Sequence, residues 1–317
     1  MIDINAAIRD LSWHREPLGL YEPIAYALEG GGKRLRPTLA MIACRMYDGN
    51  EEQTLPVALA LEIFHNFTLL HDDVMDHAPV RRGRPTVHVR WDDNTAILSG
   101  DQMMTEAYIR LESVDPARLP RVLHIFNRMA TDIWSGQQLD MEYEHRENVT
   151  IDEYIEMVRL KTSVLLGTAL QLGALMADAP EPDQQLLYRI GERIGLAFQI
   201  QDDVLDVWGD ECTFGKRIGG DIVQNKKSMV QIMALHHADA ARKKELHEWL
   251  HRETFDEAEK IREVTRLYNE IHVRPLCDER IAAYTNEAMG YIEQLPLPVE
   301  KKTELIDIAR KLLNRKN

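Results

Sequence analysis

The sequence feature that most constrains this chain is an acidic pattern that occurs twice, each time at the end of an apolar stretch. Residues 64–84 read FHNFTLLHDDVMDHAPVRRGR and contain Asp72, Asp73 and Asp76. The apolar residues before the acids recur at roughly helical spacing, which predicts a helix that ends near Pro79. Asp72 and Asp76 then share one face near the negative end of the helix dipole. Two carboxylates so placed repel each other and favour a divalent cation between them.

The second copy lies 130 residues further along the chain. Residues 198–206 read FQIQDDVLD, with Asp202, Asp203 and Asp206 in the same spacing. An acidic helix end in solvent would explain one such motif, but its recurrence in an equivalent setting argues against that reading. Two apolar helices with the same acid triplet can face each other across a cavity. Oxygen ligands of this kind suit Mg²⁺, which is commonly shared with substrate phosphates.

Composition limits the class of protein and its partners. The 317 residues include 44% hydrophobic and 28% charged side chains, which suits a globular protein with a large core. The net charge of −14 argues against a nucleic-acid partner. Three widely spaced cysteines (Cys44, Cys212, Cys277) form no zinc pattern and fit a reducing compartment. No signal peptide or transmembrane segment is recognisable, so we expect a cytoplasmic protein.

The pattern of apolar residues predicts helix almost throughout, and strand-like alternation is rare. Glycine and proline separate the expected helices, and no linker divides the chain. We therefore predict an all-α protein with one domain over residues 1–317. The expected helices lie near residues 5–29 (one or two helices), 38–48, 54–76, 90–112, 118–146, 151–178, 183–207, 226–250, 256–272, 277–293 and 299–314.

Basic residues gather in a glycine-rich loop before the first acid motif. Residues 30–37 read GGGKRLRP; the glycines break a helix, and Pro37 suits the first turn of the next one. Lys33 and Arg36 then precede a helix N-terminus, where backbone N–H groups and the helix dipole favour an anion. The spacing of a Walker loop is absent. A basic surface loop is the plainer alternative.

Other polar residues accompany each acid motif. Arg81, Arg82 and Arg84 follow the first motif, and His65 lies seven residues, nearly two helical turns, before Asp72. Lys161 enters a long apolar helix, where a snorkelling lysine is the ordinary reading. Glycines and further lysines, including Lys216 and Lys226, follow the second motif.

These groups together predict the chemistry of a ligand. Carboxylates repel a diphosphate, but metal ions can bridge the two, and lysine or arginine completes the neutralisation. The apolar helices beneath favour an apolar remainder on the same ligand. No nucleophile set of the Ser/His/Asp or Cys/His kind is recognisable. Metal-assisted departure of diphosphate, leaving a carbocation in a dry pocket, fits all of these features.

The sequence resembles the trans-isoprenyl diphosphate synthases of the polyprenyl synthetase family from Gly31 to about Ser228. The motifs that carry the resemblance stand in the family's order: GGKRLRP, HDDVMD followed by RRGRPT, Gly-Gln at 136–137, Lys-Thr at 161–162, FQIQDDVLD, FGK, GGD and NKKS. The resemblance implies the isoprenoid synthase fold, in which ten or more helices surround a deep central cavity, usually in a homodimer. It also implies isoprenyl diphosphates as substrates.

The resemblance further implies roles for residues, position by position. Three Mg²⁺ ions would be held by the outer acids, while Asp73 and Asp203 support them. The allylic diphosphate ionises, the isopentenyl double bond attacks the cation, and a proton is lost to the released diphosphate. The implied metal ligands are Asp72, Asp76, Asp202 and Asp206; the isopentenyl diphosphate ligands are Lys33, Arg36, His65 and Arg82; the allylic diphosphate ligands are Arg81, Lys161, Thr162, Gln199, Lys216 and Lys226.

Product length is expected to depend on the helix before Asp72. Phe67 and Thr68 lie about one turn before that aspartate, where a bulky ring would limit the growing chain. In the family that the sequence resembles, an aromatic residue there accompanies short products. The first motif also lacks the two-residue insertion of many bacterial farnesyl synthases, which favours C20 over C15. Ordinary core packing of Phe67 is the alternative.

Several alternatives remain open at this point. The product could be C15 farnesyl diphosphate or a longer polyprenyl diphosphate. A class I terpene cyclase would carry a second motif resembling NDxxSxxxE, where this chain has QDDVLD. A non-catalytic subunit of a prenyl synthase would be expected to lose one acid motif. The sequence after about residue 235 indicates no chemistry.

Overall fold

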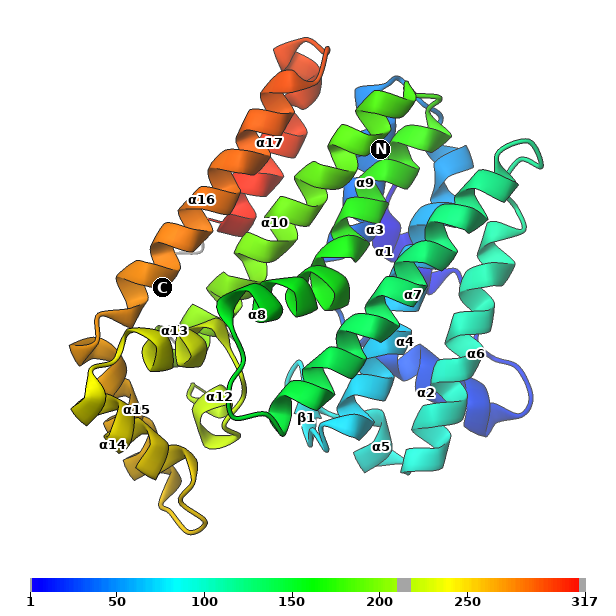
Figure 1. Cartoon of the computed structure of the whole chain (residues 1–317). Helices are drawn as coiled ribbons and strands as arrows, with labels where there is room; N and C mark the ends of the chain where they lie inside the picture. The colour runs from blue at the N-terminus through cyan, green and yellow to red at the C-terminus, as the bar shows by residue number, and fades with distance from the viewer. Residues whose placement is uncertain (1, 210–217, 314–317) are drawn as a thin grey trace. The chain divides into compact units, whose positions relative to one another are not determined.

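The computed structural model describes residues 2–209 and 218–313, and almost all of its regular structure is α-helical (Figure 1). The predicted all-α fold is therefore confirmed. The chain divides into two compact units. The first lies within residues 1–128, 168–188 and 295–305, and the second within residues 129–167, 189–294 and 306–317.

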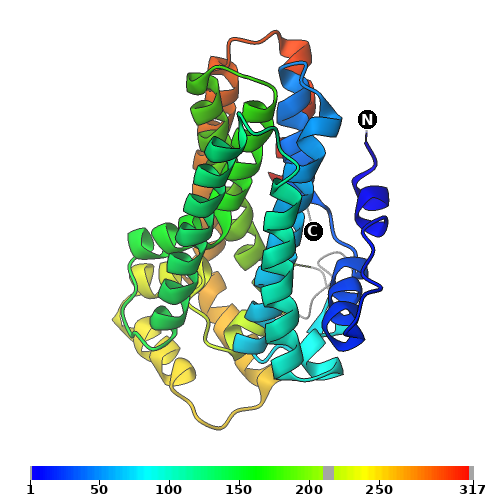
Figure 2. The same ribbon diagram turned by 90° about the vertical axis from the view of Figure 1, so that its right-hand side faces the viewer.

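Helix α4 (Glu51–Met75) is the central element of the first unit. It packs along α3 (Leu35–Met46) and α6 (Asp93–Leu111), and α6 is the teal helix that faces the viewer in Figure 2. Side chains of Asn50 and Asp92 accept backbone N–H bonds at the starts of α4 and α6, as N-cap residues do. The other elements of this unit are α1 (Ile4–Arg9), α2 (Leu18–Glu29), β1 (Val80–Arg81), β2 (Arg84–Pro85) and α5 (Val87–Arg90).

The second unit is built around part of α10 (Glu181–Trp208). Leu196, Ile200 and Val204 of this helix join a buried cluster with residues of α13 and α16. The other elements are α8 (Ile151–Val158), the π-helical turn η1 (Arg159–Ser163), α12 (Gly220–Val223), α13 (Met229–His237), α14 (Ala240–Leu250), α15 (Glu257–Glu270) and α16 (Val273–Gln294). Residues of α7 (Leu119–Glu144), α9 (Val164–Met176), α10 and α17 (Val299–Leu313) belong to both units.

The structure differs from the expected helices in three places. Residues 80–85 form a short antiparallel hairpin, whose turn residues Arg82 and Gly83 have φ of +52° and +73°. A two-residue hairpin turn needs such angles, but the usual Asn-Gly or Asp-Gly signal is absent. The helix expected at 226–250 is divided, because Ala238 is extended and Asp239 caps a new helix. The helix expected at 151–178 contains η1.

Two further observations concern the length of the helices and the state of the cysteines. No helix in the described ranges is long and apolar enough to cross a membrane. Cys44 and Cys277 are buried free thiols, and Cys212 lies outside the described residues. A cytoplasmic location and a single domain over the whole chain stay predictions.

Candidate active site

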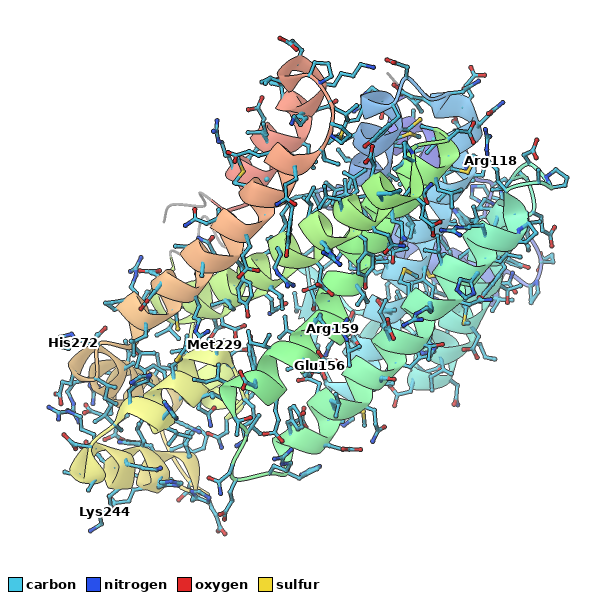
Figure 3. The ribbon with its side chains drawn as sticks, turned by 45° about the horizontal axis from the view of Figure 1, so that its top comes forward. Arg118, Glu156, Arg159, Met229, Lys244 and His272 are labelled. Carbon is cyan, nitrogen blue, oxygen red and sulfur yellow. The ribbon has the colours of Figure 1, made fainter. Side chains whose placement is uncertain are left out.

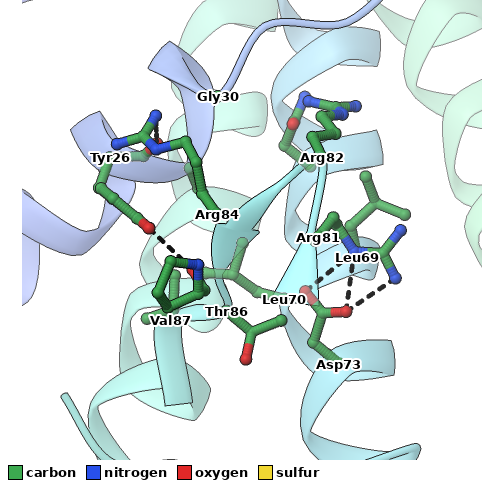
Figure 4. Close-up of a pocket in the computed structure, with 13 residues that line it drawn as sticks. Tyr26, Gly30, Leu69, Leu70, Asp73, Arg81, Arg82, Arg84, Thr86 and Val87 are labelled. Atoms are coloured by element: carbon green, nitrogen blue, oxygen red, sulfur yellow. Dashed lines mark hydrogen bonds and ion pairs between the residues drawn. The ribbon is translucent and has the colours of Figure 1, made fainter. Parts of the chain in front are cut away.

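The first acid motif occupies the C-terminal turn of α4. Asp76 is the C-cap residue, and its N–H donates to the carbonyl of Asp72 at 2.8 Å. Asp73 is buried and accepts from Arg81 through Nε at 2.8 and 2.9 Å and through Nη2 at 2.8 Å (Figure 4). Burial raises the pKa of Asp73, although the Arg81 guanidinium acts in the opposite direction. The middle acid thus holds the hairpin on the helix, while Asp72 is half-buried and Asp76 exposed.

The glycine-rich loop is attached to α4 through Arg34. This buried side chain donates to Glu62 Oε1 at 2.7 Å, to the Leu28 carbonyl at 2.5 Å and to Asn5 Oδ1 at 3.2 Å. Its φ of +46° lies in the left-handed region, so the chain turns at this residue. The contacts fix the residue that joins two predicted ligands, Lys33 on the loop and Arg36 in the first turn of α3.

Arg82 contacts the same loop from the hairpin side. Its Nη1 donates to the Gly31 carbonyl. Gly32 has a φ of +130°, and a Cβ there would lie 3.0 Å from the guanidinium carbon of Arg82. A side chain at Gly32 would therefore displace Arg82, so this glycine is required by both conformation and space.

His65 of α4 lies among the arginines of this region. Its pKa is lowered well below the ordinary value by burial and by the charges of Arg36, Arg82, Arg81 and Arg34, in that order. The imidazole is therefore neutral near pH 7. Four cations that act on one histidine create a positive field that favours an anionic ligand.

A pocket in the first unit opens beside these residues (Figure 4). Leu69, Leu70 and Val87 supply apolar surface, and Arg81, Arg82 and Arg84 supply charge. The Arg84 guanidinium lies 3.9 Å from the Tyr26 ring centroid, and the Tyr26 hydroxyl donates to the Pro85 carbonyl at 2.8 Å. These contacts hold the second strand of the hairpin against α2.

The two predicted chain-length residues lie in different environments. Phe67 is buried in an edge-to-face series, with ring centroids 5.5 Å from Phe64 and 4.8 Å from His71. Gly100 of α6 permits this packing, because a Cβ there would lie 2.4 Å from His71 Nε2. Thr68 is half-buried, and its hydroxyl donates to the His65 carbonyl at 2.8 Å. A role for either residue in product length stays a prediction.

The second acid motif lies inside α10, and its middle acid makes several hydrogen bonds. Asp203 is buried and accepts from the Tyr154 hydroxyl, from Met229 N at 2.8 Å and from Gln199 Nε2 at 3.2 Å. Burial and the charge of Asp221 raise the pKa of Asp203 to about 6. Tyr154 was not predicted, because no local signal in the sequence pairs it with an acid 49 residues later.

Asp206 holds the start of the segment that follows. Its carboxylate accepts from Asp221 N at 3.0 Å, and its carbonyl accepts from Gly219 N at 2.7 Å. Burial and the charge of Asp221 raise the pKa of Asp206 to about 7. Residues 219–229, called the Lys226 segment below, are therefore attached to α10 at both ends, by Asp206 and by Asp203. Asp202, the first acid of the motif, is half-buried.

Lys161 and Thr162 lie on the π-helical turn, whose first residue, Arg159, pairs with Glu156 of α8 (Figure 3). Lys161 Nζ lies 2.5 Å from Asp140 Oδ2. The backbone of α7 approaches closely, because a Cβ at Gly136 would lie 2.3 Å from Lys161 N. Such turns occur often at functional sites, and a glycine on the facing helix was the available sequence signal.

The described site residues that the sequence predicts divide into two groups, one in each unit. Whether the two groups face each other stays a prediction. Lys216 lies outside the described residues. Glu62 was not predicted either, although a lone acid on an apolar helix face three residues before His65 indicates a buried partner. The first group contains Lys33, Arg36, His65, Phe67, Thr68, Asp72, Asp76, Arg81 and Arg82; the second contains Lys161, Thr162, Gln199, Asp202, Asp206 and Lys226.

The donor set fits magnesium better than a metal held by protein alone. Among residues 2–209 and 218–313, no three His, Cys, Asp or Glu side chains converge enough to hold a metal ion. Mg²⁺ usually needs only one or two carboxylates, with waters and substrate phosphates completing its shell. Asp72, Asp76 and Asp202 offer carboxylate oxygens of that kind at exposed or half-buried positions.

The all-α fold and the paired acid motifs define the isoprenoid synthase class of enzymes. Comparison with known proteins shows that the chain belongs to the polyprenyl synthetase family, whose sequence model matches residues 18–269. It is therefore an enzyme that transfers prenyl groups.

Two relatives and one solved structure resemble this chain in sequence or in fold. The geranylgeranyl diphosphate synthase of Methanosarcina mazei is 41% identical over 233 residues, which cover 73% of this chain and 72% of that protein. The short chain isoprenyl diphosphate synthase of Methanocaldococcus jannaschii is 41% identical over 232 residues, 73% and 71% of the two chains. A crystal structure of a geranylgeranyl pyrophosphate synthase has a TM-score of 0.92 at 39% identity and covers 100% of both chains.

Proposed function

We propose that the protein condenses isopentenyl diphosphate with an allylic diphosphate and releases a C20 product, geranylgeranyl diphosphate. One observation carries the proposal: each unit combines an intact acid motif with its own basic residues. An enzyme with two diphosphate substrates needs both. The names of the relatives from Methanosarcina mazei and other archaea support the C20 product.

Isopentenyl diphosphate would bind to the basic residues of the first unit. Lys33 on the glycine-rich loop, Arg36 in the first turn of α3 and Arg82 on the hairpin supply charge. The neutral imidazole of His65 donates a hydrogen bond to a phosphate oxygen, and the bound anion favours its protonation. The contacts of Arg34 with Glu62 hold the loop in place before the substrate arrives.

The allylic diphosphate would bind to the remaining predicted residues, which are Arg81, Lys161, Thr162, Gln199, Lys216 and Lys226. When bound by Asp72, Asp76, Asp202 and Asp206, three Mg²⁺ ions would neutralise the leaving diphosphate. The allylic C–O bond breaks and the diphosphate leaves with the bonding pair. The π electrons of isopentenyl diphosphate then form the new C–C bond, and the diphosphate takes the proton lost as the new double bond forms. Buried apolar residues beneath exclude water from the cation.

Three further expectations belong to this proposal. They are a homodimer, a cytoplasmic location and a single catalytic domain over residues 1–317. The second candidate is a C15 product, favoured by the buried ring of Phe67 five residues before Asp72. A longer polyprenyl product is the third.

A product assay tests the proposal. Purified protein is incubated with Mg²⁺, labelled isopentenyl diphosphate and dimethylallyl, geranyl or farnesyl diphosphate in turn, and the products are separated by chain length. A C20 product that disappears with chelator supports the proposal, and a C15 or C25 product would correct its length. Cyclic hydrocarbon from a starter alone would indicate a cyclase. No turnover with any starter would favour a non-catalytic subunit.

A further inference from the structure

Lys260 is a lysine in the interior of the second unit. It lies near the start of α15, and its side chain has no exposed surface. The ammonium donates to Asn225 Oδ1 at 2.6 Å and to the Val223 carbonyl at 3.2 Å, and it lies 4.1 Å from the Phe255 ring centroid. In the part of the chain that the structure describes, no carboxylate forms an ion pair with it. Burial lowers the pKa of Lys260.

A buried cation with only neutral partners is costly, because it loses its hydration without gaining an ion pair. A methionine would fill similar volume without this cost. Among the described residues, the polar contacts of Lys260 go to one stretch of chain, the Lys226 segment, and they end next to Lys226 itself. The unusual lysine is therefore best explained by what it does to that segment.

Asn225 connects Lys260 to the next residue in the chain, Lys226. Its φ of +55° is left-handed, which asparagine adopts more readily than most residues. Its side chain accepts from Lys260 and donates to the Leu250 carbonyl at 2.9 Å, so both ends of the amide are fixed. The next N–H, that of Lys226, donates to the Asp221 carbonyl at 2.9 Å. The backbone direction at Lys226 thus depends on the conformation of Asn225.

Helix α15 also limits the start of the Lys226 segment. Gly219 has a φ of +81°, and a Cβ there would lie 2.7 Å from the side chain of Ile261. The segment is therefore fixed at three points: at Gly219 by Asp206 and Ile261, at Asn225 by Lys260, and at Met229 by Asp203.

We propose that Lys260 is a positioning residue for Lys226, so that α15 serves the allylic diphosphate site without touching the substrate. The inference rests on the proposed function, and it gives a role to a part of the chain where the sequence indicates no chemistry. Loss of the Lys260 donors frees Asn225 to leave its left-handed conformation, and Lys226 then moves with it. Binding of the allylic diphosphate weakens, whereas isopentenyl diphosphate, held by residues of the first unit, is unaffected.

Steady-state kinetics of Lys260→Met and Lys260→Gln test the inference. Lys260→Met should raise the KM for the allylic diphosphate about tenfold, the effect of one or two lost hydrogen bonds, and leave the KM for isopentenyl diphosphate within about twofold. Lys260→Gln keeps two N–H donors without the charge and should restore most of the affinity. The matched control is Lys244→Met, which makes the same change at an exposed lysine of α14. Equal rises in both KM values, or unchanged values, would overturn the inference.

Two additions keep the test decisive. Asn225→Gly removes the amide but still permits a positive φ, so it should reproduce the effect of Lys260→Met even if that variant fails to fold; an unchanged allylic KM would contradict the inference. Calorimetric binding of a non-ionising thio analogue of the allylic diphosphate gives a readout without turnover. A wild-type protein that binds the analogue without prenyl transfer would contradict the proposed function alone, whereas equal affinity of wild type and Lys260→Met would contradict the positioning role alone.

Discussion

The two acid motifs share one sequence pattern but lie in electrostatic fields of opposite sign. The first is surrounded by arginines, which pair with Asp73 and lower the pKa of His65. The second has a further acid, Asp221: burial and the charge of Asp221 raise the pKa of Asp203 and Asp206, while Lys226 acts in the opposite direction. Burial, followed by the charges of Asp203 and Asp221, raises the pKa of Tyr154.

The difference arises from the residues that come after each motif in the chain. RRGR follows the first motif and places Arg81 on its middle acid. GGD comes after the second motif and brings another acid, Asp221, to its third acid. The arginines after the first motif suit a substrate anion, whereas Asp221 adds a negative charge beside the second motif. The same acid spacing therefore takes different chemical roles, because the neighbouring residues set the field.

The largest effect is expected where the buried ion pair of the first unit is broken. Glu62→Ala leaves Arg34 buried without its carboxylate, which should lower the free energy of unfolding by about 3–5 kcal/mol. Denaturant unfolding measures this. Glu248→Ala, at an exposed ion pair of the second unit, is the control and should cost no more than about 1 kcal/mol. Similar losses in the two variants would show that the Arg34–Glu62 contact adds little.

Removal of Phe67 should change both stability and product. Phe67→Ala deletes a buried ring, and large-to-small changes of this kind cost about 3–5 kcal/mol. If the ring limits the growing chain, the product becomes longer than that of the wild type. Chromatography of the dephosphorylated products detects this, with Phe126→Ala as a control for cavity formation in the same aromatic series. An unchanged product distribution would leave Phe67 as a core residue only.

Substitution of the first acid of either motif should lower mainly kcat. Asp72→Ala and Asp202→Ala remove proposed metal ligands, and loss of such electrostatic stabilisation should lower kcat about 10²–10³-fold. Rates at saturating substrates over a range of Mg²⁺ concentrations test this. Asp101→Ala changes an exposed acid of α6 and should have no effect. A normal rate in either motif variant would contradict its role as a ligand.

The middle acids have different partners: Asp73 accepts from Arg81, whereas Asp203 accepts from the Tyr154 hydroxyl. Tyr154→Phe removes the hydroxyl that donates to buried Asp203, which should lower the free energy of unfolding by about 1–3 kcal/mol. Chemical denaturation measures the change. Tyr291→Phe, on α16 of the same unit, is the control for loss of a phenol. No destabilisation would indicate that water or Gln199 satisfies Asp203 equally well.

The sequence predicted the helical architecture because helix signals are local. Apolar spacing, glycine and proline breaks and capping residues act within a few residues of each other. The hairpin at 80–85 and η1 were missed because they depend on contacts made elsewhere. The turn at Arg82 adopts positive φ without a favoured residue, and η1 packs against Gly136 of α7.

In the candidate site too, local motifs could be read from the sequence, whereas contacts between residues distant in sequence could not. Motif order predicted which residues bind ligands, and those assignments stay predictions. The partners of the residues that hold them in place could not be predicted from local patterns. Glu62, Tyr154 and Lys260 act through contacts 28, 49 and 35 residues away in sequence, and only the folded chain reveals these pairs.

His65 and Asp206 should contribute opposite pH dependences, which is the smallest effect expected. Burial, reinforced by neighbouring like charges, disfavours the charged form of each group. The pKa of His65 is lower in the folded protein than its ordinary value of 6.5, so the unfolded chain binds the extra proton and stability falls as pH drops below about 6.5. The pKa of Asp206 is raised from 3.8 to about 7, so the folded protein keeps a proton that the unfolded chain loses, and stability falls as pH rises from about 4 to 7.

The two contributions oppose each other in the wild type, and variants separate them. Without His65 (His65→Gln), stability should decrease more steeply as pH rises from 4 to 7; without the titrating acid (Asp206→Asn), it should decrease less or increase. Melting temperatures in metal-free buffer between about pH 4.5 and 8 measure both slopes. Parallel curves for the three proteins would mean that the two groups titrate alike in the folded and unfolded states. A change in slope for one variant only would assign the shifted titration to that residue alone, because each substitution removes one titrating group from one unit.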